Sequence, residues 1–289
     1  MKRIKERYNP QKITYQGKCN IIDTDNQRLV IKSHTNDLED LSSYLSSRGF
    51  NSYPKIIDKY DDKYVYEYLS DSNEPINQKA NDLALTISDL HNKTSHNIKI
   101  VKNDIDNVYS SLNDNINYIS NYYARLFKEI ISEEYPSPSH YLLIRNQSTI
   151  LNLIKYLKEE LKTWNHEILN SEEIRVVYCH NNLSINHYLN HKLISWDKYR
   201  IDTPILDIIN LYHNDYNKYD FSSFLKTYIT NMDLTPNEER LLFISISIPE
   251  VIYFTDDEME NTIKVSRLID YINNTEKLIR PYYPIKQKE

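Results

Sequence analysis

The sequence predicts an α+β protein with two lobes, a small β-rich N-lobe that carries one helix and a large, mostly helical C-lobe. Three observations predict this fold class. Short apolar runs separated by polar turns fill the first seventy residues, as in a sheet. Beyond Glu74-Pro75 the apolar residues recur every three or four positions, as on helices. Between residues 175 and 197 a short strand and a hairpin interrupt the helical pattern.

The N-lobe is expected at residues 1–68. Its first segment, ITYQGKCNIIDTDNQRLVIK, predicts two antiparallel strands joined by the polar turn DTDNQ. One helix should follow, because Leu38, Leu41 and Leu45 share a face after a predicted Asn36 cap, and Gly49 suits the left-handed position that ends a helix. The stretch YPKIIDKYDDKYVYEYL then predicts a strand, an Asp-Asp turn and a second strand.

The C-lobe is expected at residues 69–289 and is predicted to be mainly helical. Apolar periodicity and Pro204 predict helices around 83–90, 102–133, 139–169, from Pro204 onward, 217–231 and 236–247. RVVY reads as a short strand, and HYLNHKLISW predicts a hairpin that turns at Asn190-His191.

Composition narrows the function classes. A chain of 289 residues with net charge −6 lacks the basic surface that nucleic acid or an anionic membrane attracts. The most hydrophobic stretch, LLFISISIPEVIYF, is broken by Pro249 and Glu250, which predicts a cytoplasmic protein. Cys19 and Cys179 lie far apart without metal-ligand spacing, so free thiols are expected.

Six short landmarks occur in a fixed order: VIK at 30–32, EYL at 67–69, ISDLHNKT, CHNNL from 179, LISWD and PILD. The chain thereby resembles the protein-kinase-like superfamily, and within it the aminoglycoside phosphotransferase and choline kinase group. The 112 residues from Tyr68 to His180 can hold two long extra helices, which favours this small-molecule branch. SYLSSRGFNSYPKIID and the overall size further resemble bacterial spore-coat kinase-like proteins of the CotS and YutH type.

The resemblance implies a role for each landmark residue. Lys32 would be the nucleotide lysine, with Glu39 as its helix partner and Asp40 as the alternative, and Glu67, Tyr68 and Leu69 would form the hinge. In the catalytic loop 179–187, Asn182 stands at the base position and His187 at a metal position. His180 of this loop and Asp207 of the following helix would have structural roles that support the loop. In the metal-strand hairpin 188–197, Ser195 stands at the other metal position.

The residues at these positions lack the expected carboxylates. An amide such as Asn182 has no lone pair basic enough to accept a proton near neutrality. Mg²⁺ prefers carboxylate oxygens, so neither the Ser195 hydroxyl nor the His187 imidazole replaces its usual ligands. Asp197 could take over the metal only if the strand slipped, because residues i and i+2 on a strand lie roughly 6–7 Å apart.

The primary hypothesis is therefore a pseudokinase that binds or scaffolds a protein partner, in a spore coat if the narrower resemblance holds, with no cofactor and no bound metal. One alternative is an active ATP- and Mg²⁺-dependent phosphotransferase that acts on a small hydroxylated acceptor through a relocated carboxylate. The other is a sensor that binds nucleotide without metal. Neither nucleic acid nor a membrane is expected as a partner.

Overall fold

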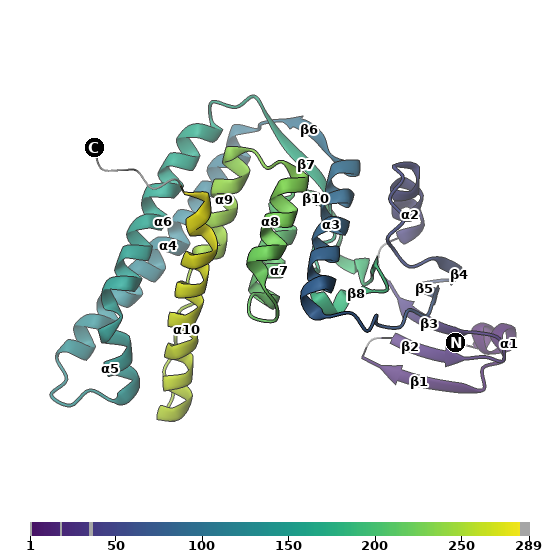
Figure 1. Ribbon diagram of the computed structural model, residues 1–289, viewed down its shortest axis with the longest axis horizontal. Coiled ribbons are helices and arrows are strands. Elements are labelled where there is room, and N and C mark those ends of the chain that lie inside the picture. The colour runs from purple at the N-terminus through teal and green to yellow at the C-terminus, as the bar shows by residue number, and fades with distance from the viewer. Residues whose placement is uncertain (1, 18, 35–36, 284–289) are drawn as a thin grey trace. The chain divides into compact units, whose positions relative to one another are not determined.

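The computed structural model describes residues 2–17, 19–34 and 37–283, with its elements labelled in Figure 1. The chain divides into two compact units. The first unit comprises residues 1–96 and 175–233, and the second comprises residues 97–174 and 234–289. Among the described helices, none combines the length and the apolar composition needed to cross a bilayer.

A five-stranded antiparallel sheet opens the first unit, with the strand order β1-β2-β3-β5-β4 (Figure 1). Its strands are β1 (Lys12–Gln16), β2 (Cys19–Asp23), β3 (Arg28–Ser33), β4 (Ile56–Tyr60) and β5 (Lys63–Glu67). The segment predicted to hold two strands holds three, because the chain reverses at Gly17, whose φ is +57°. Glycine adopts this left-handed conformation without strain, so β1 can fold back on β2.

The register of this sheet positions Lys32. Cys19 of β2 and Tyr64 of β5 are its cross-strand partners. A helix that the sequence analysis did not predict, α1 (Lys2–Tyr8), adds Ile4 to a small apolar core. The other buried members of this core are Ile22, Leu29, Ile31 and Val65.

The predicted single helix of the N-lobe is α2 (Leu38–Ser47). Its N-cap is Asp37, whose side chain accepts the backbone N–H of Glu39 at 2.9 Å. The predicted cap, Asn36, lies outside the described residues. Gly49 follows the helix with a φ of +76°, as expected for a residue that ends a helix in the left-handed region.

Helices and short strands complete the first unit. The helices are α3 (Ile76–Thr94), α7 (Ile205–Asp215) and α8 (Phe221–Met232), and α3 packs against α8. Strand β7 (Glu173–Cys179) pairs with β10 (Arg200–Asp202), and β6 (His96–Lys99) begins at His96, where the first segment of this unit ends.

The hairpin of the first unit is shorter than predicted. It consists of β8 (Tyr188–Leu189) and β9 (Lys192–Leu193) and turns at Asn190 and His191, as predicted. Both turn residues have positive φ, as a tight type I′ turn requires. After Leu193 the chain leaves the strand, passes Ser195 in the left-handed region and enters the 3₁₀ turn Trp196–Lys198.

The second unit is built around long helices. They are α4 (Lys102–Ile131), α5 (Pro138–Arg145), α6 (Gln147–Ile168), α9 (Pro236–Ser247) and α10 (Glu258–Ile279). Asn146 ends α5, so the single helix predicted at 139–169 is two helices. Their apolar faces form one continuous core that includes Tyr123, Phe127 and Trp164. Core side chains at helical spacing explain why the sequence pattern located α4 and α9 closely.

Candidate functional site

The loop between β7 and β8 is held from its buried side by Asp207, in the first turn of α7. This carboxylate is fully buried and accepts the backbone N–H groups of His180 and Asn181 at 2.7 and 2.6 Å. His91 of α3 places its Nε2 3.1 Å from the same carboxylate and its Nδ1 2.8 Å from the Tyr228 hydroxyl. A buried carboxylate is tolerated only when donors surround it, so this network is a structural support for the loop.

His180 is a buried part of the same support. Its Nε2–H donates to the carbonyl oxygen of Ile194 at 2.8 Å, and its ring packs against Trp196 at 4.7 Å between centroids. Burial lowers the pKa of His180 to about 4, although the Asp207 carboxylate acts in the opposite direction. The ring is therefore neutral near pH 7, and its Nδ1 has no hydrogen-bond partner among the described residues.

The three positions that lack carboxylates are joined by hydrogen bonds. The Asn182 side-chain amide donates to the carbonyl oxygen of Ser195 at 3.3 Å. His187 uses Nδ1–H to donate to the carbonyl oxygen of Asn182 at 2.7 Å. The structure thus links Asn182, His187 and Ser195 through hydrogen bonds from side chains to the backbone, and these bonds hold the loop.

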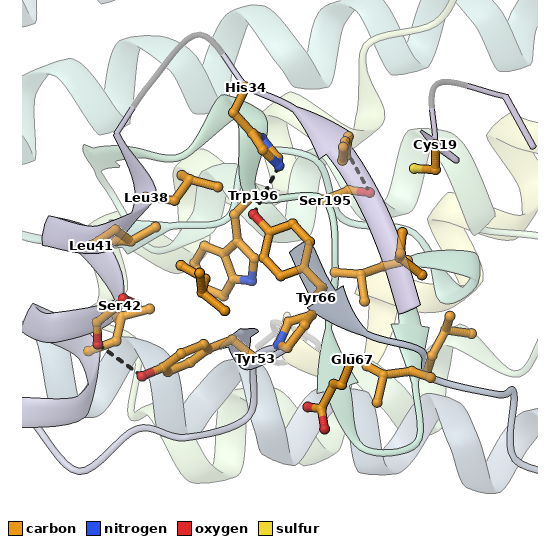
Figure 2. Close-up of a pocket in the computed structure, with 18 residues that line it drawn as sticks. Cys19, His34, Leu38, Leu41, Ser42, Tyr53, Tyr66, Glu67, Ser195 and Trp196 are labelled. Atoms are coloured by element: carbon orange, nitrogen blue, oxygen red, sulfur yellow. Dashed lines mark hydrogen bonds between the residues drawn. The ribbon is translucent and has the colours of Figure 1, made fainter. Parts of the chain in front are cut away.

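Lys32, on β3, reaches Asp197. Its Nζ forms an ion pair with Asp197 Oδ2 and lies 3.4 Å from Ser195 Oγ. His34 holds the other carboxylate oxygen, with 2.6 Å between its Nδ1 and Asp197 Oδ1. The Nε2 of His34 in turn lies 3.0 Å from the Tyr66 hydroxyl, and Figure 2 shows these two side chains pointing toward one another.

This geometry corrects the predicted position of Asp197. Residues 195–197 do not lie on a strand, because Ser195 has a φ of +68° and Asp197 lies in a 3₁₀ turn. The strand spacing that was expected to keep Asp197 away from the site does not apply. Burial alone would raise the pKa of Asp197, but the close contacts with His34 and Lys32 hold it well below its usual range. Asp197 is therefore a carboxylate beside Lys32, already paired with cationic and imidazole donors.

The expected pair between Lys32 and Glu39 is absent. Glu39, more than half exposed, instead lies 3.1 Å from Lys59 Nζ, and Lys59 also pairs with Asp37 at 2.8 Å. Glu39 is near the start of α2, where a carboxylate is favoured by the helix dipole and by Lys59 of the neighbouring strand. The residue that takes the place of Glu39 beside Lys32 is Asp197.

The hinge residues differ in what they contact. Glu67 accepts the backbone N–H of Lys55 at 3.1 Å and forms an ion pair with Lys192 of β9. Tyr68 donates its backbone N–H to the carbonyl oxygen of Arg28 at 3.2 Å, and its ring lies under the Arg28 guanidinium. Leu69 lines the cavity described next.

A cavity of about 110 Å³ lies between β3, α2, the hinge and the chain from Leu189 to Trp196. Its walls are mainly apolar and include Val30, Leu189 and Ile194. The polar lining residues include His34 and Ser195, which Figure 2 labels, and also Lys32; Glu67 is the acidic residue among them. A mainly apolar cavity with a few polar groups at one side is typical of a small-molecule site.

The donors at this site do not fit Mg²⁺. That ion requires near-octahedral oxygen coordination with one or two carboxylates, whereas the candidates here are an amide, an imidazole, a hydroxyl and Asp197. Both oxygens of Asp197 already face donors, from Lys32 and His34. Coordination of the ion would require breaking these contacts, and Glu67 is the only carboxylate among the described residues that line the cavity.

Comparison with known proteins gives the fold. No protein-family model and no curated protein sequence matches the chain. The solved aminoglycoside phosphotransferase from Alicyclobacillus acidocaldarius is 12% identical, with a TM-score of 0.60 over 94% of this chain and 92% of that chain. The chain therefore has the protein-kinase-like fold of the aminoglycoside phosphotransferases, which confirms the fold that its sequence landmarks predicted.

Two further solved structures are similar, with lower TM-scores. Choline kinase LicA from Streptococcus pneumoniae is 15% identical, with a TM-score of 0.46 over 98% of this chain and 99% of that chain. An AMP-bound spectinomycin phosphotransferase is 10% identical, with a TM-score of 0.48 over 98% of this chain and 93% of that chain. The spore-coat branch stays a prediction.

Sequence reasoning did not single out His34 or Lys192. His34 could have been found, because it lies two residues after Lys32, directly after the end of β3, and side chains at i and i+2 of an extended chain point to the same side. Lys192 carried no such signal, since its partner Glu67 is 125 residues away in the sequence.

Proposed function

We propose that this chain is a pseudokinase, a cytoplasmic kinase-fold protein that binds a partner and does not transfer phosphoryl groups. The observation that carries the proposal is that both carboxylate oxygens of Asp197 already contact Lys32 and His34. Phosphoryl transfer requires a base for the nucleophile and anionic ligands for the metal. The base position holds Asn182, and the metal positions hold His187 and Ser195.

The charge balance of the site supports this function. In an active site of this kind the lysine contacts the phosphates while carboxylates hold Mg²⁺. Here Lys32 and Asp197 neutralise each other, so neither is available for those roles without loss of the pair. Losing general-base assistance alone costs roughly 10²–10⁴ in rate, and losing the metal ligands compounds that loss.

One observation favours a second candidate function, nucleotide binding without metal. The cavity has a mainly apolar lining that includes Val30, Leu189 and the hinge residue Leu69, and Lys32 is also a lining residue. An apolar lining of this kind suits a flat aromatic base, and a phosphate could exchange with Asp197 as the partner of Lys32. In this candidate the protein is a sensor, with the nucleotide as its ligand and no catalytic step.

A thermal-shift titration separates these functions. The untagged protein is heated with ATP or ADP, each in the presence of EDTA and in the presence of Mg²⁺. We expect no change in Tm with either nucleotide, as a scaffold requires. A shift of equal size with and without Mg²⁺ would replace the scaffold by the sensor. A shift that requires Mg²⁺ would overturn the pseudokinase proposal and support the active phosphotransferase with Asp197 as its metal ligand.

Restoring the missing ligands should restore metal dependence. In the triple variant Asn182→Asp, His187→Asn, Ser195→Asp, we expect ATP to raise the Tm only when Mg²⁺ is present, because two carboxylates and an amide oxygen then suit the ion. Aspartate tolerates the left-handed backbone of Ser195 better than most residues. Asn182→Asp alone is the matched control and should show no Mg²⁺ dependence. A folded triple variant that ignores Mg–ATP would show that the assigned roles are wrong.

We further propose that the protein is a component of a spore coat. It rests on the resemblance of SYLSSRGFNSYPKIID to the CotS and YutH type. Detection of the chain in coat extracts from spores of its own organism would support it, and its confinement to the cytosol of growing cells would contradict it.

A further inference from the structure

A second group of charged side chains converges outside the cleft, on the first unit. Glu74 lies just before α3, Asp82 lies two turns into that helix, and His191 lies in the β8–β9 turn. One ligand atom from each of the three residues lies within 4.8 Å of the others. The Nε2 of His191 is 3.2 Å from Glu74 Oε1, so the imidazole already points at the carboxylate. Three separate chain segments thus deliver one nitrogen and two carboxylates to one place.

Within the described part of the chain, no lysine or arginine forms an ion pair with Glu74 or Asp82. Lys79, on the same helix, pairs with Asp71 at 2.6 Å, and Lys192, next to His191, pairs with Glu67. With a neutral imidazole, the cluster carries two negative charges.

We propose that Glu74, Asp82 and His191 form a binding site for a divalent transition-metal ion such as Zn²⁺. One imidazole and two carboxylates are ligands that Zn²⁺ accepts, at about 2.0–2.2 Å, with a water molecule as the fourth ligand. Mg²⁺ is disfavoured because it seldom takes imidazole. The two carboxylates supply the charge that the ion neutralises, and His191 supplies the selectivity.

A metal at this site would connect the hairpin to α3 and to the segment that follows the hinge. The same hairpin carries Leu189 into the cavity wall and holds the hinge through the Lys192–Glu67 pair. A bound ion would therefore fix the hairpin that supplies Leu189 to the cavity wall, and the proposal is independent of the function proposed for the cavity itself. The site uses no cysteine, in agreement with the free thiols of Cys19 and Cys179.

Another trio, His91, Cys179 and Asp207, also lies close together but offers no such site. Both ring nitrogens of His91 have partners in Asp207 and Tyr228. Burial strongly raises the pKa of Cys179, which keeps the thiol protonated and unsuited to metal binding.

The test is calorimetric titration of the untagged, chelator-treated chain with Zn²⁺ alone. We expect saturable binding of one ion per chain, together with a rise in Tm. The His191→Asn variant should weaken Zn²⁺ binding at least about tenfold, a loss comparable to that seen when even an outer-shell partner is removed. Asparagine tolerates the left-handed backbone at this turn position, so the hairpin should be retained.

Two controls make the result specific. Asp82→Asn removes a second ligand and should also weaken binding. His140→Ala removes an imidazole that is 2.9 Å from one carboxylate, Glu133, and should leave binding unchanged. The absence of saturable Zn²⁺ binding would overturn the proposal. So would unchanged affinity in His191→Asn, or displacement of Zn²⁺ by equal concentrations of Mg²⁺, which would indicate a merely acidic surface.

Discussion

The Asp207→Ala variant is expected to lose about 3–5 kcal/mol of unfolding free energy, the usual cost of removing one partner from a buried charged network. The Asp207 carboxylate is fully buried and accepts two backbone N–H groups of the loop as well as the contact from His91. Alanine would leave these donors without an acceptor in a site that water does not reach. Each unsatisfied buried donor costs about 1–3 kcal/mol, which gives the same magnitude.

Denaturant unfolding followed by tryptophan fluorescence measures this loss, because Trp196 packs against His180 in the same loop. The matched control is Asp89→Ala, which breaks an exposed i, i+4 pair with Lys93 on α3. That pair should be worth about 0.3–0.5 kcal/mol. If Asp207→Ala cost no more than Asp89→Ala, Asp207 would not be the support of the loop.

The protein should also lose stability between about pH 6.5 and pH 4 because of His180. Its pKa is about 4 in the folded protein and about 6.5 in the unfolded chain. As the pH falls below 6.5, His180 becomes protonated in the unfolded state but stays neutral in the folded state. Unfolding therefore becomes more favourable. The contribution is fully present above pH 6.5 and is lost as the pH approaches the folded value. A difference of this size corresponds to about 3 kcal/mol.

A His180→Gln variant tests this assignment. Glutamine keeps an N–H donor for the carbonyl oxygen of Ile194 but does not titrate. We expect the variant to show a flatter dependence of unfolding free energy on pH between 4 and 6.5, whereas His166→Gln, at an exposed position on α6, should leave it unchanged. Carboxylates act in a different window: the lowered pKa of Asp37, about 2, matters only below about pH 4. Equal slopes for wild type and His180→Gln would contradict the prediction.

Features set by residues close together in the sequence could be predicted, whereas features set by contacts between distant segments could not. Helices α4 and α9 were located closely because burial of one face imposes a local period on the sequence. The hairpin turn was also predictable, since Asn190 and its neighbour tolerate positive φ. The third strand of the N-terminal segment was missed, because β1 is only five residues long and its turn depends on a single glycine.

The missing carboxylates of the cleft follow from residue identity, because an amide, an imidazole and a hydroxyl keep their chemistry in any fold. The ordered landmarks likewise predicted the fold, since they reflect local strand, loop and helix geometry. The partners of Lys32 and Glu39 could not be predicted in this way. Asp197 is 165 residues from Lys32, and it reaches the lysine because Ser195 adopts a left-handed backbone. Such pairings are set by how distant segments pack, which no local pattern encodes.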